Sequence, residues 1–253
     1  MKTKQSPLPY KPLHVPGQSL DELIRLQDDE IVKYYWPAAL FVLLAVLDWC
    51  RWFLSSPIDP WFSSITAVLV SSYCSYKLLS LRPIIRTLKL GRDGERIVAE
   101  CLETLRSEGC LIYHDIVAGD FNLDHVILSS RGIYVVETKT LSKPARGEIS
   151  FRGENIIAGD QFLGTEPIIQ AKAEATWLQS LLKESTGKSC FVMPVVVFPG
   201  WYVQPMPNSL KETVWVLNPK ALPSFIEEQP TILDDSDVHL AAFHLSRYIR
   251  IYN

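Results

Sequence analysis

The chain has 253 residues, of which 47% are hydrophobic and 21% are charged. This composition excludes an intrinsically disordered protein, and the length suits one full domain plus an additional element. The chain has a net charge of −3, whereas most nucleic-acid-binding domains are basic overall. A local basic face is still compatible with this net charge. The five cysteines are scattered without metal-ligand spacing, which argues against zinc and favours reduced thiols in a cytosolic compartment.

The first third of the chain has the pattern of a membrane anchor. Residues 1–33 contain no long apolar run, so we expect a flexible tail followed by a short polar helix. Two strongly apolar segments follow, residues 34–54 and 61–81, each close to the roughly 20 helical residues that cross a bilayer. Residues 55–60 hold two prolines and an aspartate, which suits a tight turn. Aromatic residues gather near the segment ends, as in interfacial belts, so the sequence predicts a transmembrane hairpin over residues 34–81.

Charged and polar residues within these segments keep a second interpretation open. Asp48 and Arg51 lie inside the first segment, and a charge at membrane depth costs about 2.5–3.5 kcal/mol on insertion scales. Their spacing allows them to pair on one helix face, and the second segment is rich in serine. The alternative is a helical hairpin buried within a soluble protein.

The distribution of basic residues predicts the orientation of the anchor. Lysine and arginine residues precede the first apolar segment and follow the second, whereas the turn between them has none. Because such residues stay on the cytoplasmic side, we expect both termini and the soluble domain in the cytoplasm. The predicted location is a bacterial-type inner (plasma) membrane, in which the protein is multi-pass.

After a basic linker at residues 82–90, helix and strand patterns alternate. Residues 91–107 repeat apolar side chains at three-and-four spacing, which predicts an amphipathic helix. The expected strands are residues 110–117, 123–128, 133–139, 147–151, 155–158, 191–198 and 213–217, and the expected later helices are 166–184 and 234–249. The turn at residues 129–132 should join its flanking strands into an antiparallel hairpin. This order predicts an α/β fold, with a mixed β-sheet flanked by helices.

Charged residues stand at the end of the strongest predicted strand. Glu137 and Lys139 are two residues apart, so they project from the same face of that strand. Asp124 lies on the neighbouring strand and can approach the same place. Two carboxylates at one site repel each other, and a hard divalent cation such as Mg²⁺ resolves the repulsion. Such an ion activates water for attack on a phosphodiester, while the lysine positions the water or neutralises phosphate charge.

These residues belong to a longer pattern that resembles the nuclease-related domain (NERD) family, a branch of the PD-(D/E)XK restriction-endonuclease-like nucleases. The matching motifs, in chain order, are Gly91-x-x-Gly94-Glu95, Leu123-Asp124-His125-Val126, Gly132-Ile-Tyr-Val-Val-Glu137-Thr-Lys139 and Gln170. The resemblance covers about residues 90 to 199 and implies a restriction-endonuclease-like core. The expected division of the chain is a cytoplasmic N-terminal tail and short helix (1–33), a transmembrane hairpin (34–81), a basic linker (82–90), a NERD-like domain (91–199) and a C-terminal strand and helix extension packed on that domain (200–253).

The resemblance also implies roles for individual residues. Asp124 and Glu137 would hold the metal, Mg²⁺ or Mn²⁺, with the backbone carbonyl of Thr138 as a third ligand. Lys139 would be the catalytic lysine, and the implied substrate is DNA or RNA. Glu95 and Gln170 would approach the site from the first and second helices of the domain.

Each of these residues also has a structural interpretation. Glu137 and Lys139 could form an ordinary surface ion pair worth under about 1 kcal/mol. Glu95 could stabilise the first turn of its helix through the helix dipole, and Gln170 could be a plain surface residue. His125 falls on the opposite strand face from Asp124, so we expect a packed or hydrogen-bonded histidine rather than a ligand.

Three hypotheses about function follow from these observations. The first is a membrane-anchored, metal-dependent nuclease that hydrolyses phosphodiester bonds of DNA or RNA. The second is a non-catalytic, membrane-tethered module that binds nucleic acid or protein and retains the nuclease fold. The third treats the hairpin as an assembly element, because serine-rich helices can pack closely in membranes and form a homo-oligomer.

Overall fold

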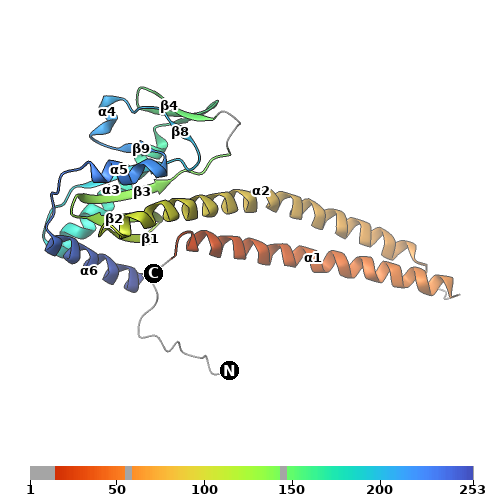
Figure 1. Ribbon diagram of the computed structural model, residues 1–253. Coiled ribbons are helices and arrows are strands. Elements are labelled where there is room, and N and C mark those ends of the chain that lie inside the picture. The colour runs from red at the N-terminus through yellow and green to blue at the C-terminus, as the bar shows by residue number, and fades with distance from the viewer. Residues whose placement is uncertain (1–14, 55–58, 143–146, 253) are drawn as a thin grey trace. The chain divides into compact units, whose positions relative to one another are not determined.

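The computed structural model describes residues 15–54, 59–142 and 147–252. The chain divides into two compact units, Ser19–Leu90 and Met1–Gln18 together with Gly91–Asn253. The first unit is helical, and the second combines helices with two β-sheets (Figure 1).

The helical unit contains α1 (Gln18–Phe53) and the first part of α2 (Trp61–Arg106). The two helices run side by side (Figure 1). Near one end, the indole Nε1 of Trp49 donates a hydrogen bond to Oγ of Ser64 at 2.8 Å. Two neighbouring helices therefore cover the two predicted apolar segments, and residues 55–58 of the expected turn between them lie outside the described residues.

Most apolar side chains of this unit are exposed, such as those of Leu40 and Phe62. In the part of the chain that the structure describes, α1 is the one helix that is long and apolar enough to cross a membrane, by length and composition alone. Since α2 does not pass the same test, the second membrane span stays a prediction.

Helix α2 is longer than the sequence patterns indicate. We expected a separate linker and a helix beginning at Gly91, but α2 continues from Trp61 through Pro83 and Gly91 to Arg106. The predicted helix start was wrong because local breakers were overridden. Glycine costs about 1 kcal/mol and proline about 3 kcal/mol in a helix interior, and burial of apolar side chains such as Leu102 offsets costs of this size.

The larger sheet has five strands in the order β1-β2-β3-β7-β9. Its strands are β1 (Leu111–Ala118), β2 (Phe121–Ser129), β3 (Gly132–Thr138), β7 (Val192–Val197) and β9 (Trp215–Leu217). The β1–β2 and β2–β3 pairs are antiparallel, as predicted for the hairpin, whereas β7 pairs in parallel with both β3 and β9. The carboxyl ends of β3, β7 and β9 therefore lie along one edge of the sheet.

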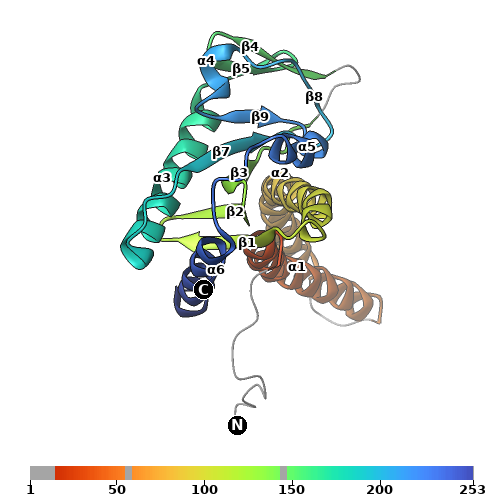
Figure 2. The ribbon, with the colours of Figure 1, turned by 60° about the vertical axis from the view of Figure 1, so that its left-hand side comes forward.

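Two apolar layers cover this sheet. On one face, α3 (Glu166–Thr186) and α6 (Asp235–Tyr252) contribute buried side chains such as Leu178 and Leu245 to a shared core with strands β1 to β3 (Figure 2). A second core contains Leu102 of α2 together with side chains of β3, β7 and β9. The expected α/β fold with a mixed sheet is confirmed.

A smaller four-stranded sheet, in the order β6-β5-β4-β8, and several short helices complete the unit. Its strands are β4 (Glu148–Arg152), β5 (Asn155–Ala158), β6 (Gln161–Gly164) and β8 (Tyr202–Val203), and the short helices are α4 (Asn208–Lys211), η1 (Pro219–Ala221) and α5 (Leu222–Glu227). The β4–β5 hairpin was predicted from the sequence. The strands β6 and β8 and the short helices were not, because such short elements show no periodicity.

Candidate functional site

The strands β2 and β3 separate where the acidic residues begin. Their ladder runs from Ser129 opposite Gly132 to His125 opposite Val136 and stops there. One residue further, the Oδ2 atom of Asp124 accepts a hydrogen bond from the backbone N–H of Thr138 at 2.8 Å. The side chain of Asp124 thus takes the place of a ladder hydrogen bond at this end of the sheet.

On its other side, the end of β3 is fixed by the parallel strand β7. Thr138 pairs with Val197, and the N–H of Lys139 donates to the carbonyl of Val197 at 2.9 Å. Glu137 is buried, and Lys139 reaches the surface with a side chain that is 27% exposed. The Glu137-Thr138-Lys139 segment is therefore held from both neighbouring strands.

Gln170 of α3 connects the charged residues. Its Nε2 donates to Oε1 of Glu137 at 2.9 Å and to Oε1 of Glu174 at 2.9 Å, while its Oε1 accepts from Nζ of Lys139 at 2.6 Å. Nζ of Lys139 also lies 2.9 Å from Oε1 of Glu137. The interpretations of Gln170 as a plain surface residue and of Glu137–Lys139 as an exposed ion pair do not fit this geometry.

Glu174 is a member of the cluster that the sequence analysis missed. It follows Gln170 by one helical turn on α3 and is almost completely buried, with 1% of its surface exposed. Burial, followed by the Glu137 carboxylate, raises the pKa of Glu174 to about 9. The available sequence signal was the spacing from Gln170, because residues four apart share a helix face.

Glu95 approaches the same cluster from α2. Burial raises its pKa to about 7, with further contributions from the carboxylates of Asp115 and Glu137. Burial also raises the pKa of Asp124 well above its usual range, with Glu137 and then Glu95 as the next causes. Because α2 begins at Trp61, Glu95 is not in a first helical turn, and the predicted dipole role was wrong.

A close approach of α2 to the end of β3 places Glu95. A Cβ atom added to Gly94 would lie 1.7 Å from Oγ1 of Thr140, so only glycine fits without a shift of that side chain. Gly94 therefore allows the helix to pass close to the segment that follows Lys139.

Asp115 is a second acidic residue whose place the sequence did not reveal. It lies between the ladder pairs His114–His125 and Ile116–Leu123, which places it opposite Asp124 across the β1–β2 pair. It is buried, and among the described residues it is the one non-glycine residue with a positive φ, 51°. Backbone strain of this kind gathers at functional sites.

One carboxylate oxygen of this cluster, Oε2 of Glu137, is suited to bind a cation. Oε1 of Glu137 is engaged by Gln170 and Lys139, but its Oε2 is buried and has no hydrogen-bond partner among the described residues. The residues present fit a divalent ion in chemistry, since hard cations take carboxylate oxygens. Within the described ranges, however, no three histidine, cysteine, aspartate or glutamate side chains are already arranged to surround an ion.

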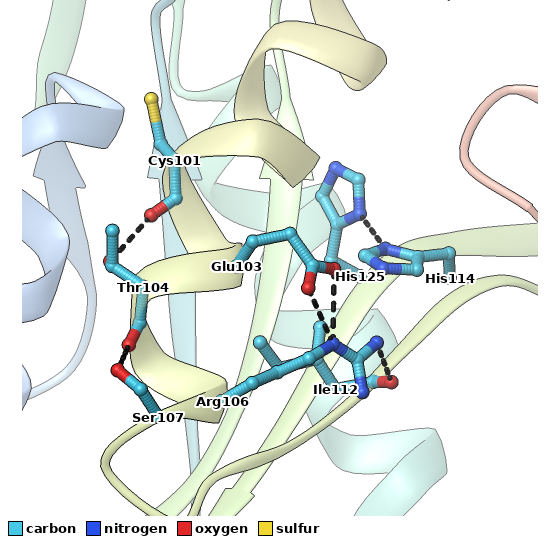
Figure 3. A network of polar contacts seen from close by, with 8 residues as sticks. All are labelled: Cys101, Glu103, Thr104, Arg106, Ser107, Ile112, His114 and His125. Atoms are coloured by element: carbon cyan, nitrogen blue, oxygen red, sulfur yellow. Dashed lines mark hydrogen bonds and ion pairs between the residues drawn. The ribbon is translucent and has the colours of Figure 1, made fainter.

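His125 lies outside this cluster and pairs with His114 across the strands. The two Nδ1 atoms are 2.8 Å apart (Figure 3). Burial lowers the pKa of His114 to about 4 and that of His125 well below its usual value. Both rings are therefore neutral near pH 7, and His125 is hydrogen-bonded, as expected from the sequence.

The fold and the site define an α/β domain with acidic residues and a lysine gathered at the carboxyl end of a central strand. The nuclease-related domain (NERD) family model matches residues 90–199. For this segment the match confirms the resemblance that the motifs predicted, and it indicates a nuclease-related function. No curated protein and no solved structure matches the chain.

Proposed function

We propose that this chain is a metal-dependent nuclease, tethered to a membrane, that hydrolyses phosphodiester bonds of DNA or RNA. The observation that carries the proposal is the arrangement around Glu137. Gln170 and Lys139 hold one carboxylate oxygen, and the other is buried near Asp124, Glu95 and Glu174 and accepts no hydrogen bond from an N–H or hydroxyl group of the described residues. An unsatisfied buried oxygen next to carboxylates of raised pKa is the environment that a cation stabilises.

Asp124 and Glu137 are the proposed metal ligands, with the carbonyl of Thr138 as the third. The N–H of Thr138 faces Asp124, and in an extended strand the carbonyl of the same residue points the same way. A bound Mg²⁺ or Mn²⁺ lowers the pKa of a coordinated water and neutralises charge on phosphate oxygens.

The protein side chains supply position and charge. Gln170 fixes Nζ of Lys139 within hydrogen-bond distance of Oε1 of Glu137, so the ammonium group stands next to the proposed ligand and partly exposed. From there it can donate to a phosphate oxygen as negative charge develops. Glu174, with a pKa of about 9, keeps a proton at neutral pH and limits the negative charge of the cluster.

Tethering at the cytoplasmic face of a membrane is the second part of the proposal. Helix α1 is long and apolar enough to cross a bilayer, and basic residues flank the predicted hairpin on both sides. A reporter fused at Asn253 that is active only outside the cytoplasm should be inactive, and activity there would contradict the proposed orientation.

Cleavage by the full-length protein tests the catalytic part. Purified in mild detergent, it should cut labelled DNA or RNA in the presence of Mg²⁺ or Mn²⁺. Lys139→Ala should reduce the rate at least 100-fold, in the range found for loss of one group that stabilises transition-state charge. Lys183→Ala removes an exposed lysine from the far end of α3 and serves as the matched control. Equal cutting by the Lys139 and Lys183 variants would refute the proposed role.

A second candidate function is a non-catalytic module that retains the fold. The observation in its favour is that Lys139, Gln170 and Glu137 satisfy one another, which is also what a purely structural network would do. Thermal unfolding with added Mn²⁺ separates the two functions. A nuclease site should be stabilised by about 2.7 kcal/mol at 100 times the dissociation constant, and Glu137→Ala should abolish the effect. A structural network should show no such dependence on Glu137.

A further inference from the structure

A cavity of about 590 Å³ opens in the C-terminal part of the α/β unit. It is lined by residues of β8, α4, β9, η1 and α5 and by the segment that leads into β8. Its volume lies in the range of about 300–1,000 Å³ that is typical of sites for small organic groups. None of its residues belongs to the cluster around Glu137.

The cavity lies along the same sheet edge as that cluster. Thr138 pairs with Val197, and Val197 pairs with Leu217, so the carboxyl ends of three parallel strands are in line. The cavity residue Asn218 directly follows β9, and Trp201 belongs to the segment that joins β7 to β8. Two inter-strand spacings separate Thr138 from Leu217, which is roughly 10 Å. A few nucleotides of an extended strand span this distance.

The lining is aromatic and apolar, with polar groups at a few points. Trp201, Tyr202 and Phe225 contribute aromatic rings, and Lys211 contributes an exposed cation. The side chain of Asn218 donates to the carbonyl of Trp201 at 2.6 Å and so fixes the backbone that carries the first two rings. Aromatic faces next to a cation are the combination that binds a base together with its phosphate.

The wall of the cavity that β9 forms includes a main-chain N–H group that can donate a hydrogen bond. β9 is the edge strand of its sheet, and the N–H of Val216 donates to Sδ of Met206 at 3.0 Å. Thioether sulfur is a weak acceptor, and methionine side chains adapt readily. The indole N–H of Trp201 is buried and has no partner among the described residues. A ligand with several hydrogen-bond acceptors would satisfy such donors better than a purely apolar peptide or acyl chain.

We propose that this cavity binds an unpaired nucleobase of the substrate strand, so that the enzyme acts on single-stranded or locally unpaired nucleic acid. The proposal rests on the proposed nuclease function and deepens it by naming the substrate class. Bases within a regular duplex are stacked on both sides and cannot enter a cavity of this kind without being flipped out.

Photocrosslinking locates the base directly. The full-length protein carrying Lys139→Ala is mixed with a short single-stranded oligonucleotide that contains 5-iodouracil, either as DNA or as RNA, and is irradiated. The adduct should map to residues 201–206. Tyr202→Ala should weaken binding of the single strand about tenfold, as expected for loss of one stacking partner, and should reduce the adduct. It should leave binding of a blunt duplex unchanged.

Tyr202 and the control Tyr252 are similarly exposed, at 63% and 66%, so neither truncation opens the core. Tyr252→Ala, at the end of α6, should bind and crosslink like the parent protein. An adduct outside the cavity, or unchanged binding by Tyr202→Ala, would overturn the nucleobase site even if the wild-type protein cleaves. Conversely, a cavity adduct in a protein that cleaves nothing would support the site and refute the nuclease function.

Discussion

The burial of Glu174 predicts that the proposed active site destabilises the fold at neutral pH. Glu174 has a raised pKa of about 9, mainly through burial and then through the Glu137 carboxylate. Because the folded-state value lies above the reference value of 4.5, the folded protein binds an additional proton between these two pH values. The contribution of Glu174 to stability should therefore be full below pH 4.5 and should fall as the pH rises towards 9.

The size of the effect follows from the same linkage. At pH 7, keeping the proton on Glu174 costs about 3 kcal/mol relative to a carboxyl group that ionises freely. Glu174→Gln preserves the shape and an acceptor for Gln170 but cannot ionise, so it should remove this cost. For a domain of this size, about 3 kcal/mol corresponds to a rise in Tm of roughly 6–12 °C.

Thermal unfolding of the full-length protein in a chelating buffer, at pH 5 and at pH 8, measures this difference. The wild-type Tm should fall between the two pH values by more than that of Glu174→Gln. Glu184→Gln, at an exposed position of the same helix, should follow the wild type. If the wild type and the Glu174 variant show the same dependence on pH, the carboxyl group of Glu174 ionises without cost, and the reasoning from burial fails.

Two further predictions concern the surroundings of the site. Gly94→Ala should lower the free energy of unfolding by about 1–3 kcal/mol, because the added Cβ would clash with the side chain of Thr140. In chemical denaturation, the additional substitution Thr140→Gly should restore part of this loss. An unchanged free energy of unfolding in the Gly94→Ala variant would contradict the close packing. The buried histidine pair should make the fold sensitive to acid, because the lowered pKa of His114, about 4, lets the unfolded chain bind more protons between pH 4 and 6.5. The contribution of His114 to stability should be full above pH 6.5 and should fall by on the order of 3 kcal/mol towards pH 4. His114→Gln should flatten that fall in Tm measurements, and an unchanged slope would show that the pair does not resist protonation.

The sequence predicted the strands around the site well because their patterns are strong and local. Residues 133–138 are mostly β-branched or aromatic, which favours a strand, and the turn before them fixes the hairpin register. Glu137 could be identified as a candidate metal ligand because side chains alternate between the two faces of β3, which determines that it shares a face with Lys139. Gln170 was found through the resemblance alone, since nothing in the local pattern of α3 distinguishes it.

Other features could not be predicted because they depend on contacts between distant segments. The continuity of α2 through Pro83 and Gly91 depends on packing that local propensity does not encode. Glu174 resembles any helical glutamate until α3 is placed against the end of β3. Asp115 looks like a strand residue in the sequence, and its positive φ appears only in the structure.

The acidic residues of the site share one electrostatic problem. Asp115 and Asp124 lie opposite each other on neighbouring strands, Glu137 lies at the end of the next strand, and Glu95 and Glu174 add carboxyl groups from two helices. Lys139 is hydrogen-bonded to Gln170 among them, and the guanidinium of Arg96 acts on Glu95. Carboxyl groups gathered in a buried place resist ionising together, so the cluster must either hold protons or take up positive charge from solution. A purely structural network would be expected to lose such carboxyl groups to neutral residues, since neutral isosteres would stabilise it. Their presence together at the carboxyl end of β3 therefore supports the proposal that this site binds a divalent cation.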